Sequence, residues 1–237
     1  MTERKSADTH RSETEFQVGK SAVRLEDGRL TIEIDEIGAP LPRRLRGKVT
    51  VTLPYMASRD FQLDPKARHF WSPACTHAQI AVDFERPGLS WKGHGYVDMN
   101  HGAEPLEKGF DYWDWSRTPL EDGDTLIRYV TDPATGPQRA LHVRIGPDGT
   151  ASETEGEASV ELPGTRIWRI DRRAGALSGA APAVKQTLED TPFYSRSLLA
   201  YPQGASGLAT HETLSCKRLR SPIVKLMLPF RMPRLSL

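Results

Sequence analysis

One segment of the chain gathers most of the side chains that could carry out acid–base chemistry. Residues 91–117 contain three of the five tryptophans of the sequence: Trp91, Trp113 and Trp115. Between them lie Tyr96, Asp98 and Asn100, spaced two residues apart. Side chains alternate along a strand, so in an extended segment this phenol, carboxyl and amide would share one face. The spacing predicts a polar row that points into an apolar interior.

Asp98 is the candidate acid of this row. A carboxyl buried in an apolar interior loses the hydration of its charged form, and its pKa rises. Such a group can hold a proton near neutral pH and donate it as a general acid. The alternative is structural: Asp98 and Asn100 would form a hydrogen-bonded pair in a glycine-rich turn. The residues of this segment leave both interpretations open.

A second candidate pair precedes this segment. Within residues 68–71, His69 and Trp71 would share one face of an extended segment, although a histidine beside a tryptophan is often only packing. Together with Tyr96 and Asp98 they suit protonation of an alkene. Aromatic faces can stabilise the cation that forms, and polar groups can direct a water molecule onto it.

Other chemistries find no support in the sequence. The patterns GxSxG, GxGxxG, HExxH and the P-loop are absent, and the seven histidines show no spacing typical of metal ligands, so we expect neither a metal nor another cofactor. The 32 basic and 31 acidic residues nearly cancel, which disfavours nucleic acid as a partner. Nothing in the sequence indicates a protein partner.

Two features predict the compartment. Cys75 and Cys216 are isolated and too few for a disulfide framework, which indicates a reducing environment. The N-terminal residues lack the apolar core of a signal peptide, and no run of about 18 apolar residues appears. We therefore expect a cytoplasmic protein.

The hydrophobic pattern of the chain predicts short strands that must position these side chains. Alternation of apolar and polar residues predicts strands at residues 30–35, 48–53, 80–84 and 141–145. Further short strands are expected at residues 124–131, 166–171, 184–189, 194–201 and 207–214. No window of 12 or more residues keeps a helical stripe, and 18 prolines with 19 glycines interrupt the chain. The predicted fold class is all-β, with antiparallel sheets closed into a barrel or stacked as a sandwich.

The order of these segments also predicts a domain division. The first residues are dense in charge, serine and threonine, which is typical of a solvated tail. The aromatic segment ends near Arg117, and a turn at 119–124 follows it. We expect a polar tail at residues 1–19, a first β domain at 20–118 and a second β domain at 119–237.

The C-terminal residues combine positive charge with apolar side chains. From Lys217 onward the chain carries six Lys/Arg and no Asp/Glu. Such a segment could contact an anionic membrane surface, or it could form a final strand with a basic outer face. Pro222, Pro229 and Pro233 argue against a long helix.

The aromatic segment resembles a family signature. The sequence WKGHGYVDMNHGAEPLEKGFDYWDWSR is similar to the pattern W-x-G-x-G-Y-x-D-x-N-x-G-x-x-P…F-x-x-W-x-W-x-R of carotenoid 1,2-hydratases, also called hydroxyneurosporene synthases. Five further blocks resemble family segments in the same order: RLTIEIDEIGAPLPRRLRGKVTV, RHFW, DTPFYSRS, THETLS and LPFRMPR. The resemblance covers residues 20 to 234. Members of this family usually carry several tens of residues before the point where this chain begins, so we expect the chain to lack their N-terminal part.

The resemblance implies a fold, a reaction and residue roles. The fold would be tandem lipocalin-like β domains, and the reaction would add water to the terminal double bond of neurosporene or lycopene without a cofactor. Asp98 would be the proton donor, Tyr96 and Trp71 would stabilise the cation or orient Asp98, and His69 would position water or the acid. Four neighbouring residues would bind the carotene: Asn100, Trp91, Trp113 and Trp115.

Two other functions suit the same scaffold. One is a lipocalin-like cyclase of polyene or polyketide products, and the other is a non-catalytic lipid or carotenoid carrier.

The resemblance to carotenoid 1,2-hydratases also implies a location. Such a hydratase would lie at the periphery of the inner, photosynthetic membrane, with the basic C-terminal tail as the contact.

Overall fold

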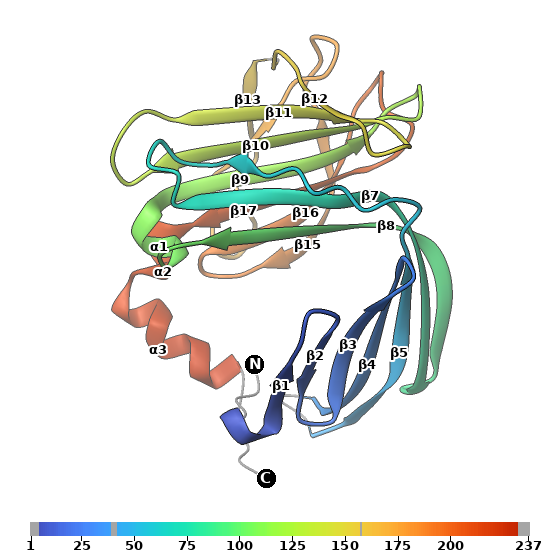
Figure 1. Ribbon diagram of the computed structural model, residues 1–237. Coiled ribbons are helices and arrows are strands. Elements are labelled where there is room, and N and C mark those ends of the chain that lie inside the picture. The colour runs from blue at the N-terminus through green and yellow to red at the C-terminus, as the bar shows by residue number, and fades with distance from the viewer. Residues whose placement is uncertain (1–4, 39–41, 157, 232–237) are drawn as a thin grey trace. The chain divides into compact units, whose positions relative to one another are not determined.

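The computed structural model describes residues 5–38, 42–156 and 158–231 and consists mostly of antiparallel strands (Figure 1). Contacts between Cα atoms divide the chain into two compact units. The first takes in the residues up to Ala57, Ala74–Asp98 and the residues from Lys225, and the second takes in Ser58–Pro73 and Met99–Val224. Strands β7 (His69–Arg86) and β8 (Leu89–Gly102) contribute to both units. The all-β prediction is confirmed.

Most of an eight-stranded sheet belongs to the first unit. Its strands follow the order β1-β2-β3-β4-β5-β7-β6, and β8 pairs with β7. The remaining bounds are η1 (Ser6–Asp8), β1 (Thr9–Arg11), β2 (Glu15–Val18), β3 (Ser21–Glu26), β4 (Arg29–Ile37), β5 (Arg44–Thr52) and β6 (Phe61–Gln62), the last of which lies in the second unit. Asp27 and Gly28 have positive φ angles of 47° and 69°, as the two-residue turn between β3 and β4 requires.

The pairing of β4 with β5 explains the alternating pattern of the sequence. Leu30 lies opposite Val51 and Ile32 opposite Val49, so both apolar rows face the same side of the sheet. A core forms there from Val51, Leu53, Cys75 and Ala78, and partly buried apolar side chains pack around it. Burial of one face fixes the register, because a shift by one residue would expose every apolar side chain.

The second unit contains a seven-stranded sheet in the order β12-β11-β10-β9-β17-β16-β15. Its strands are β9 (Phe110–Pro119), β10 (Thr125–Pro133), β11 (Arg139–Ile145), β12 (Ala151–Glu153), β15 (Ala183–Asp190), β16 (Tyr194–Ala200) and β17 (Ala209–Ser215). A separate pair is formed by β13 (Ser159–Leu162) and β14 (Arg172–Gly175). Within the described residues, the α-helices are α1 (Leu106–Gly109), α2 (Cys216–Leu219) and α3 (Pro222–Arg231).

Alternation along β9 gives the seven-stranded sheet an aromatic face and a polar face. Trp113 and Trp115 point to one side of this strand. Tyr112, Asp114 and Ser116 point to the other, where Asp114 and Ser116 are 0% and 3% exposed. Both faces of this sheet are therefore covered at its centre.

The predicted polar tail differs from the structure. Within residues 5–19, β1 and β2 pair with each other, and β2 pairs with β3. Every residue of β1 is exposed and none of β2 is fully buried, so main-chain hydrogen bonds pair these strands without an apolar period that would mark them. The predicted domain boundary at 118/119 falls at the end of β9, which pairs with β10 in one sheet, whereas the compact units divide within β7 and β8.

The strand predicted at 166–171 is wrong. Residues 166–168 form a turn, and Arg169 has a positive φ angle of 49°. The carboxylate of Asp190 accepts hydrogen bonds from the backbone N–H groups of Ile167 and Trp168, at 2.7 Å and 3.3 Å. A side chain distant in sequence therefore holds this segment in a turn, whereas its apolar residues suggested a strand.

The C-terminal segment also differs from expectation. In place of a final strand, α3 forms with Pro222 as its first residue. A proline is compatible with the first turn because its missing N–H would have no partner there. Among the described residues, no helix is long and apolar enough to cross a membrane.

Candidate active site

The segment that carries Tyr96 and Asp98 is a strand, as the spacing predicted. Both residues lie on β8 in the first unit, and Val97 between them packs against the apolar core. Tyr96 and Asp98 therefore project from the opposite face of the strand. Both side chains are half-buried rather than fully buried. Trp91, on the same strand, is 46% exposed.

His69 begins β7 in the second unit, and its backbone is held by Asp64. The Asp64 carboxylate accepts hydrogen bonds from the N–H groups of Lys66, Arg68 and His69 at 2.8, 2.9 and 2.7 Å. Asp64 is only 5% exposed, so these bonds replace the water that its charge has lost. The turn before β7 thereby fixes the position from which the imidazole of His69 projects.

The imidazole of His69 occupies a narrow slot. Its ring centroid lies 4.7 Å from that of Phe110, and it is 5% exposed. A Cβ atom on Gly102 would lie 2.7 Å from Nδ1 of His69, and a Cβ atom on Gly109 would overlap the other side of the ring. Glycine at both positions leaves the space that the imidazole occupies.

The Nε2 atom of His69 is free to form a hydrogen bond with a bound molecule. Its Nε2 lies 3.8 Å from Oε1 of Glu104, which is too long for a hydrogen bond. Among the described residues Nε2 is buried without a hydrogen-bond partner. A buried ring nitrogen in this state can form a hydrogen bond with a molecule that enters beside it.

Trp71 lies in an aromatic cluster within the second unit, formed by Phe61, Trp71, Trp113 and Tyr129. Trp71 is 0% exposed, and its ring centroid lies 5.6 Å from Phe61 and 6.0 Å from Tyr129. The Trp113 ring is 5.6 Å from Tyr129. The two contacts with Tyr129 are edge-to-face, so the edge of one ring meets the electron-rich face of the other. The structure thus brings Trp71 and Trp113, both predicted from the sequence, into one cluster.

Tyr129 links two further predicted residues, Asn100 and Trp115, to this cluster. Its hydroxyl donates to Oδ1 of Asn100 at 3.2 Å, and it lies opposite Trp115 in the pairing of β9 with β10. Trp115 is 3% exposed, whereas Asn100 is exposed. Sequence reasoning missed Tyr129. The only signal was the alternation of Ile127, Tyr129 and Thr131 along a predicted strand, which indicates burial and says nothing of its neighbours.

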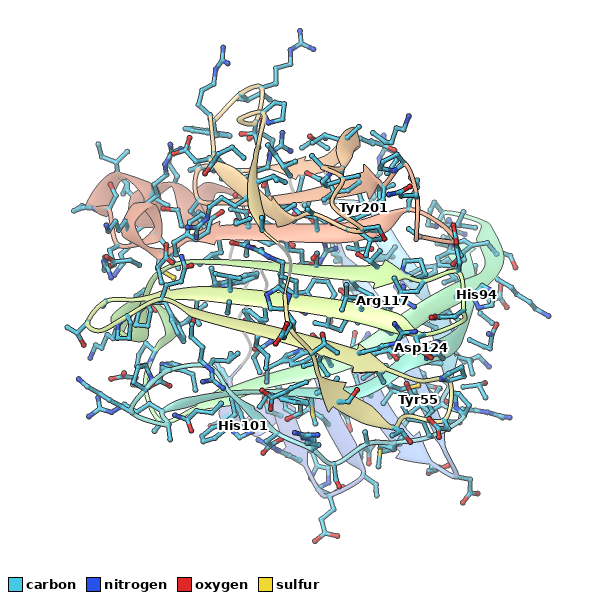
Figure 2. The ribbon with its side chains drawn as sticks, turned by 90° about the horizontal axis from the view of Figure 1, so that it is seen from above. Tyr55, His94, His101, Arg117, Asp124 and Tyr201 are labelled. Carbon is cyan, nitrogen blue, oxygen red and sulfur yellow. The ribbon has the colours of Figure 1, made fainter. Side chains whose placement is uncertain are left out.

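His101 of the aromatic segment is engaged at the surface (Figure 2). Its ring stacks on Phe70 with centroids 5.3 Å apart, and its Nε2 lies 3.2 Å from Oδ2 of Asp60. The hydrogen bond from Ser72, and to a smaller extent His101, lowers the pKa of Asp60. His101 is therefore paired with a surface carboxylate. Among the described residues, no group of three His, Cys, Asp or Glu side chains is arranged to hold a metal ion.

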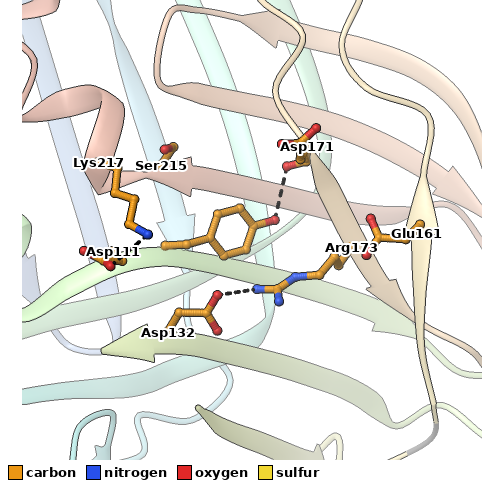
Figure 3. Close-up of a pocket in the computed structure, with 8 residues that line it drawn as sticks. Asp111, Asp132, Glu161, Asp171, Arg173, Ser215 and Lys217 are labelled. Carbon is orange, nitrogen blue, oxygen red and sulfur yellow. Dashed lines mark hydrogen bonds and ion pairs between the residues drawn. The ribbon is translucent and has the colours of Figure 1, made fainter. Parts of the chain in front are cut away.

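A pocket of about 510 Å³ lies in the second unit, outside the predicted site residues (Figure 3). Its lining consists of Asp111, Tyr112, Asp132, Glu161, Asp171, Arg173, Ser215 and Lys217. Arg173 pairs with Asp132 at 3.0 Å and Lys217 with Asp111 at 3.1 Å, while the guanidinium of Arg173 lies 4.4 Å from the Tyr112 ring centroid. A lining this charged does not suit an apolar polyene.

The polar face of the seven-stranded sheet is equally unsuited to an apolar ligand. Arg128 donates to the buried Asp114 and, at 3.0 Å, to Ser159. Burial, and to a lesser extent Arg173, lowers the pKa of Arg128 to about 10. The pKa of His211 is lowered to about 4, chiefly by burial. The aromatic cluster on the other face is the part of this unit whose chemistry suits a polyene.

Comparison with known proteins identifies the family. The family model for carotenoid hydratase CrtC matches residues 1–236. The chain is also 36% identical over 237 residues to the acyclic carotenoid 1,2-hydratase of Rhodobacter capsulatus, covering 99% of this chain and 83% of that protein. The chain belongs to the carotenoid hydratase CrtC family. The resemblance predicted from the signature and the five blocks is confirmed.

Two further members of this family are similar over the whole chain but are longer. The acyclic carotenoid 1,2-hydratase of Thiocapsa roseopersicina is 42% identical over 237 residues, and that of Rubrivivax gelatinosus is 38% identical over 240 residues. These matches cover 100% and 99% of this chain. The chain spans 58% of the length of each of these two relatives.

Solved structures show the fold. A protein assigned as AttH from Nitrosomonas europaea matches with a TM-score of 0.61 and 14% identity, over 89% of this chain and 73% of that one. Kievitone hydratase from Nectria haematococca matches with a TM-score of 0.54 and 11% identity, over 86% and 71% of the two chains. At these identities the likeness concerns the fold alone. It confirms the lipocalin-like architecture that the resemblance implied.

Proposed function

We propose that this chain is a carotenoid 1,2-hydratase that adds water to the terminal double bond of an acyclic carotene of the neurosporene or lycopene type. The observation that carries the proposal is similarity along the whole chain to acyclic carotenoid 1,2-hydratases. The buried aromatic cluster supports it, because a hydrocarbon substrate and a cationic intermediate both interact favourably with aromatic rings.

Asp98 is the proton donor in this proposal. The π electrons of the terminal double bond form a C–H bond with the proton of the carboxyl group, which leaves a positive charge on the tertiary carbon. The oxygen of a water molecule then forms a C–O bond at that carbon, and one proton of this water returns to the carboxylate. The sum is addition of one water molecule, so the step needs no electron acceptor and no cofactor.

The other site residues have supporting roles in this scheme. Tyr96 and Trp71 stabilise the cation or orient Asp98, because a phenol and an indole ring can both interact with positive charge. His69 positions the attacking water or the acid. Its buried Nε2, which has no hydrogen-bond partner among the described residues, is the atom that supports this role.

Binding of the carotene is assigned to a set of apolar and amide side chains: Trp91, Asn100, Trp113 and Trp115. The contact of Tyr129 with Asn100 supports this assignment, since it ties the amide to the aromatic cluster. The basic C-terminal segment is proposed to contact the membrane in which such a substrate dissolves, which would make this a cytoplasmic protein at the periphery of that membrane.

The test is conversion of lycopene or neurosporene in cells that make either carotene. Hydroxylated product is scored by chromatography and mass for the parent chain, for Asp98→Asn and for the matched control Asp83→Asn, an exposed carboxylate on β7. We expect product from the parent and the control and none from Asp98→Asn. Equal product from Asp98→Asn would refute the role of this carboxyl. No product from the parent would refute the activity of this chain and favour a carrier or a cyclase.

A further inference from the structure

The turn between β13 and β14 presents apolar side chains to solvent. It has the sequence Arg166-Ile167-Trp168-Arg169, and all four residues are exposed. Ile167 is 72% exposed and Trp168 is 37% exposed. Two large apolar side chains side by side at the tip of a turn leave apolar area in water, and a surface that covered this area would gain the free energy of its burial.

The backbone of this turn is held from two sides. Asp190 accepts from the N–H groups of Ile167 and Trp168 at 2.7 Å and 3.3 Å. Arg218, on α2, donates to the carbonyl oxygens of Trp168 and Arg169 at 2.6 Å and 3.0 Å. Since the backbone polar groups are engaged by the protein, the side chains of Ile167 and Trp168 are held outward. A partner that covers them pays little conformational entropy for ordering the turn.

The charges around the tip favour an anionic partner. Among the described residues, Arg166, Arg169 and Arg218 form no ion pair with a carboxylate. Asp190 directs its carboxylate at the N–H groups of the turn. Ile223, in the first turn of α3 and only five residues after Arg218, is also 72% exposed. Apolar tips bordered by unpaired arginines are typical of segments that lie in a membrane interface.

We propose that residues 166–169 dock this protein on an anionic phospholipid membrane. Ile167 and Trp168 enter the boundary between headgroups and acyl chains, where a tryptophan can bury its ring and keep its N–H hydrated. Arg166 and Arg169 contact the phosphate groups above them. Residues 166–169 lie outside the set of proposed catalytic residues, so this contact can be measured without turnover.

The experiment is co-sedimentation of the full chain with vesicles of phosphatidylcholine and with vesicles that also contain phosphatidylglycerol. We expect binding to the anionic vesicles that weakens as salt is added, and little binding to the neutral ones. The variant Arg166→Gln/Arg169→Gln should lower the apparent affinity by about 30-fold, from the loss of two cations at an anionic surface. The matched control is Lys108→Gln/Lys185→Gln, which removes two exposed cations elsewhere in the second unit.

The apolar part of the tip is tested by Ile167→Ser/Trp168→Ser, which should weaken binding by about tenfold or more. Leu188→Ser/Leu208→Ser is its control, because these leucines are 47% and 48% exposed. Failure of the parent to bind anionic vesicles would overturn the proposal. Equal binding by the tip variants and their controls would also overturn it. Both outcomes are independent of whether any carotene is hydrated.

Discussion

His211 offers a test of the polar face through the pH dependence of stability. Its ring is 0% exposed on β17, and its Nε2 donates to the carbonyl oxygen of Arg173 at 2.9 Å. Burial, and to a lesser extent the positive charges of Arg128 and Arg172, lowers the pKa of His211 to about 4. The hydrogen bond to Arg173 acts in the opposite direction and does not cancel the effect of burial.

The sign follows from the two pKa values. In the unfolded chain a histidine has a pKa of about 6.5, so between pH 6.5 and pH 4 the unfolded state binds a proton that the folded state excludes. The free energy of unfolding therefore falls as the pH drops through this window. For a folded-state pKa of about 4, the loss between pH 7 and pH 5 from His211 alone is about 2 kcal/mol.

The perturbation is His211→Gln, whose amide can still donate to the carbonyl of Arg173 but does not titrate. Urea unfolding is followed by tryptophan fluorescence at pH 7 and pH 5, since four of the five tryptophans lie in the unit that contains His211. The variant is expected to be less stable than the parent at pH 7 because its packing differs. Its loss of stability between the two pH values should be about 2 kcal/mol smaller.

The control is His10→Gln, which changes an exposed histidine on β1. It should lose as much stability between pH 7 and pH 5 as the parent does. If His211→Gln also loses as much as the parent, His211 is not the buried neutral group that the geometry indicates, and the reasoning fails.

Three further outcomes are expected. Asp64→Ala leaves three backbone N–H groups without their acceptor and should lower the free energy of unfolding by about 1–3 kcal/mol, as measured by urea unfolding; unchanged stability would contradict the role assigned to this carboxylate. Gly109→Ala places a methyl group against the His69 ring and should reduce carotene hydration in cells. Its control, Gly164→Ala, should not, because the nearest contact of the added Cβ atom is at 3.7 Å; similar product from both variants would argue against a functional role for the narrow slot around His69. Burial raises the pKa of the Cys216 thiol to about 12, so iodoacetamide at pH 8 should modify it in urea but not in the native protein, as mass spectrometry would show.

Much of the strand pattern could be predicted from local alternation. The runs that begin at Leu30 and at Val49 became β4 and β5, and they pair with their apolar residues opposite each other. The segment with Tyr96 and Asp98 became β8. Period-two patterning is a local property, and it survives folding whenever one face of a strand is buried.

Predictions failed where long-range contacts override local pattern. Residues 166–171 are apolar enough for a strand, but Asp190 and Arg218 hold the backbone in a turn. The burial of Asp98 was also overestimated, since the side chain is half-buried. Alternation tells which residues share a face, but not how much of that face its neighbours cover.

The sequence by itself determined the family, the all-β fold and the identity of the candidate site residues. The reason is that the signature and the alternation are both local patterns of residue types, which can be recognised without knowing the fold. Only the tertiary structure decided how those residues are supported. Tyr129 meets Trp71 and Asn100 across segments distant in the chain, and the slot for His69 depends on Gly102 and Gly109. These contacts depend on which strands become neighbours, a choice set by burial over the whole chain rather than by any local run of residues.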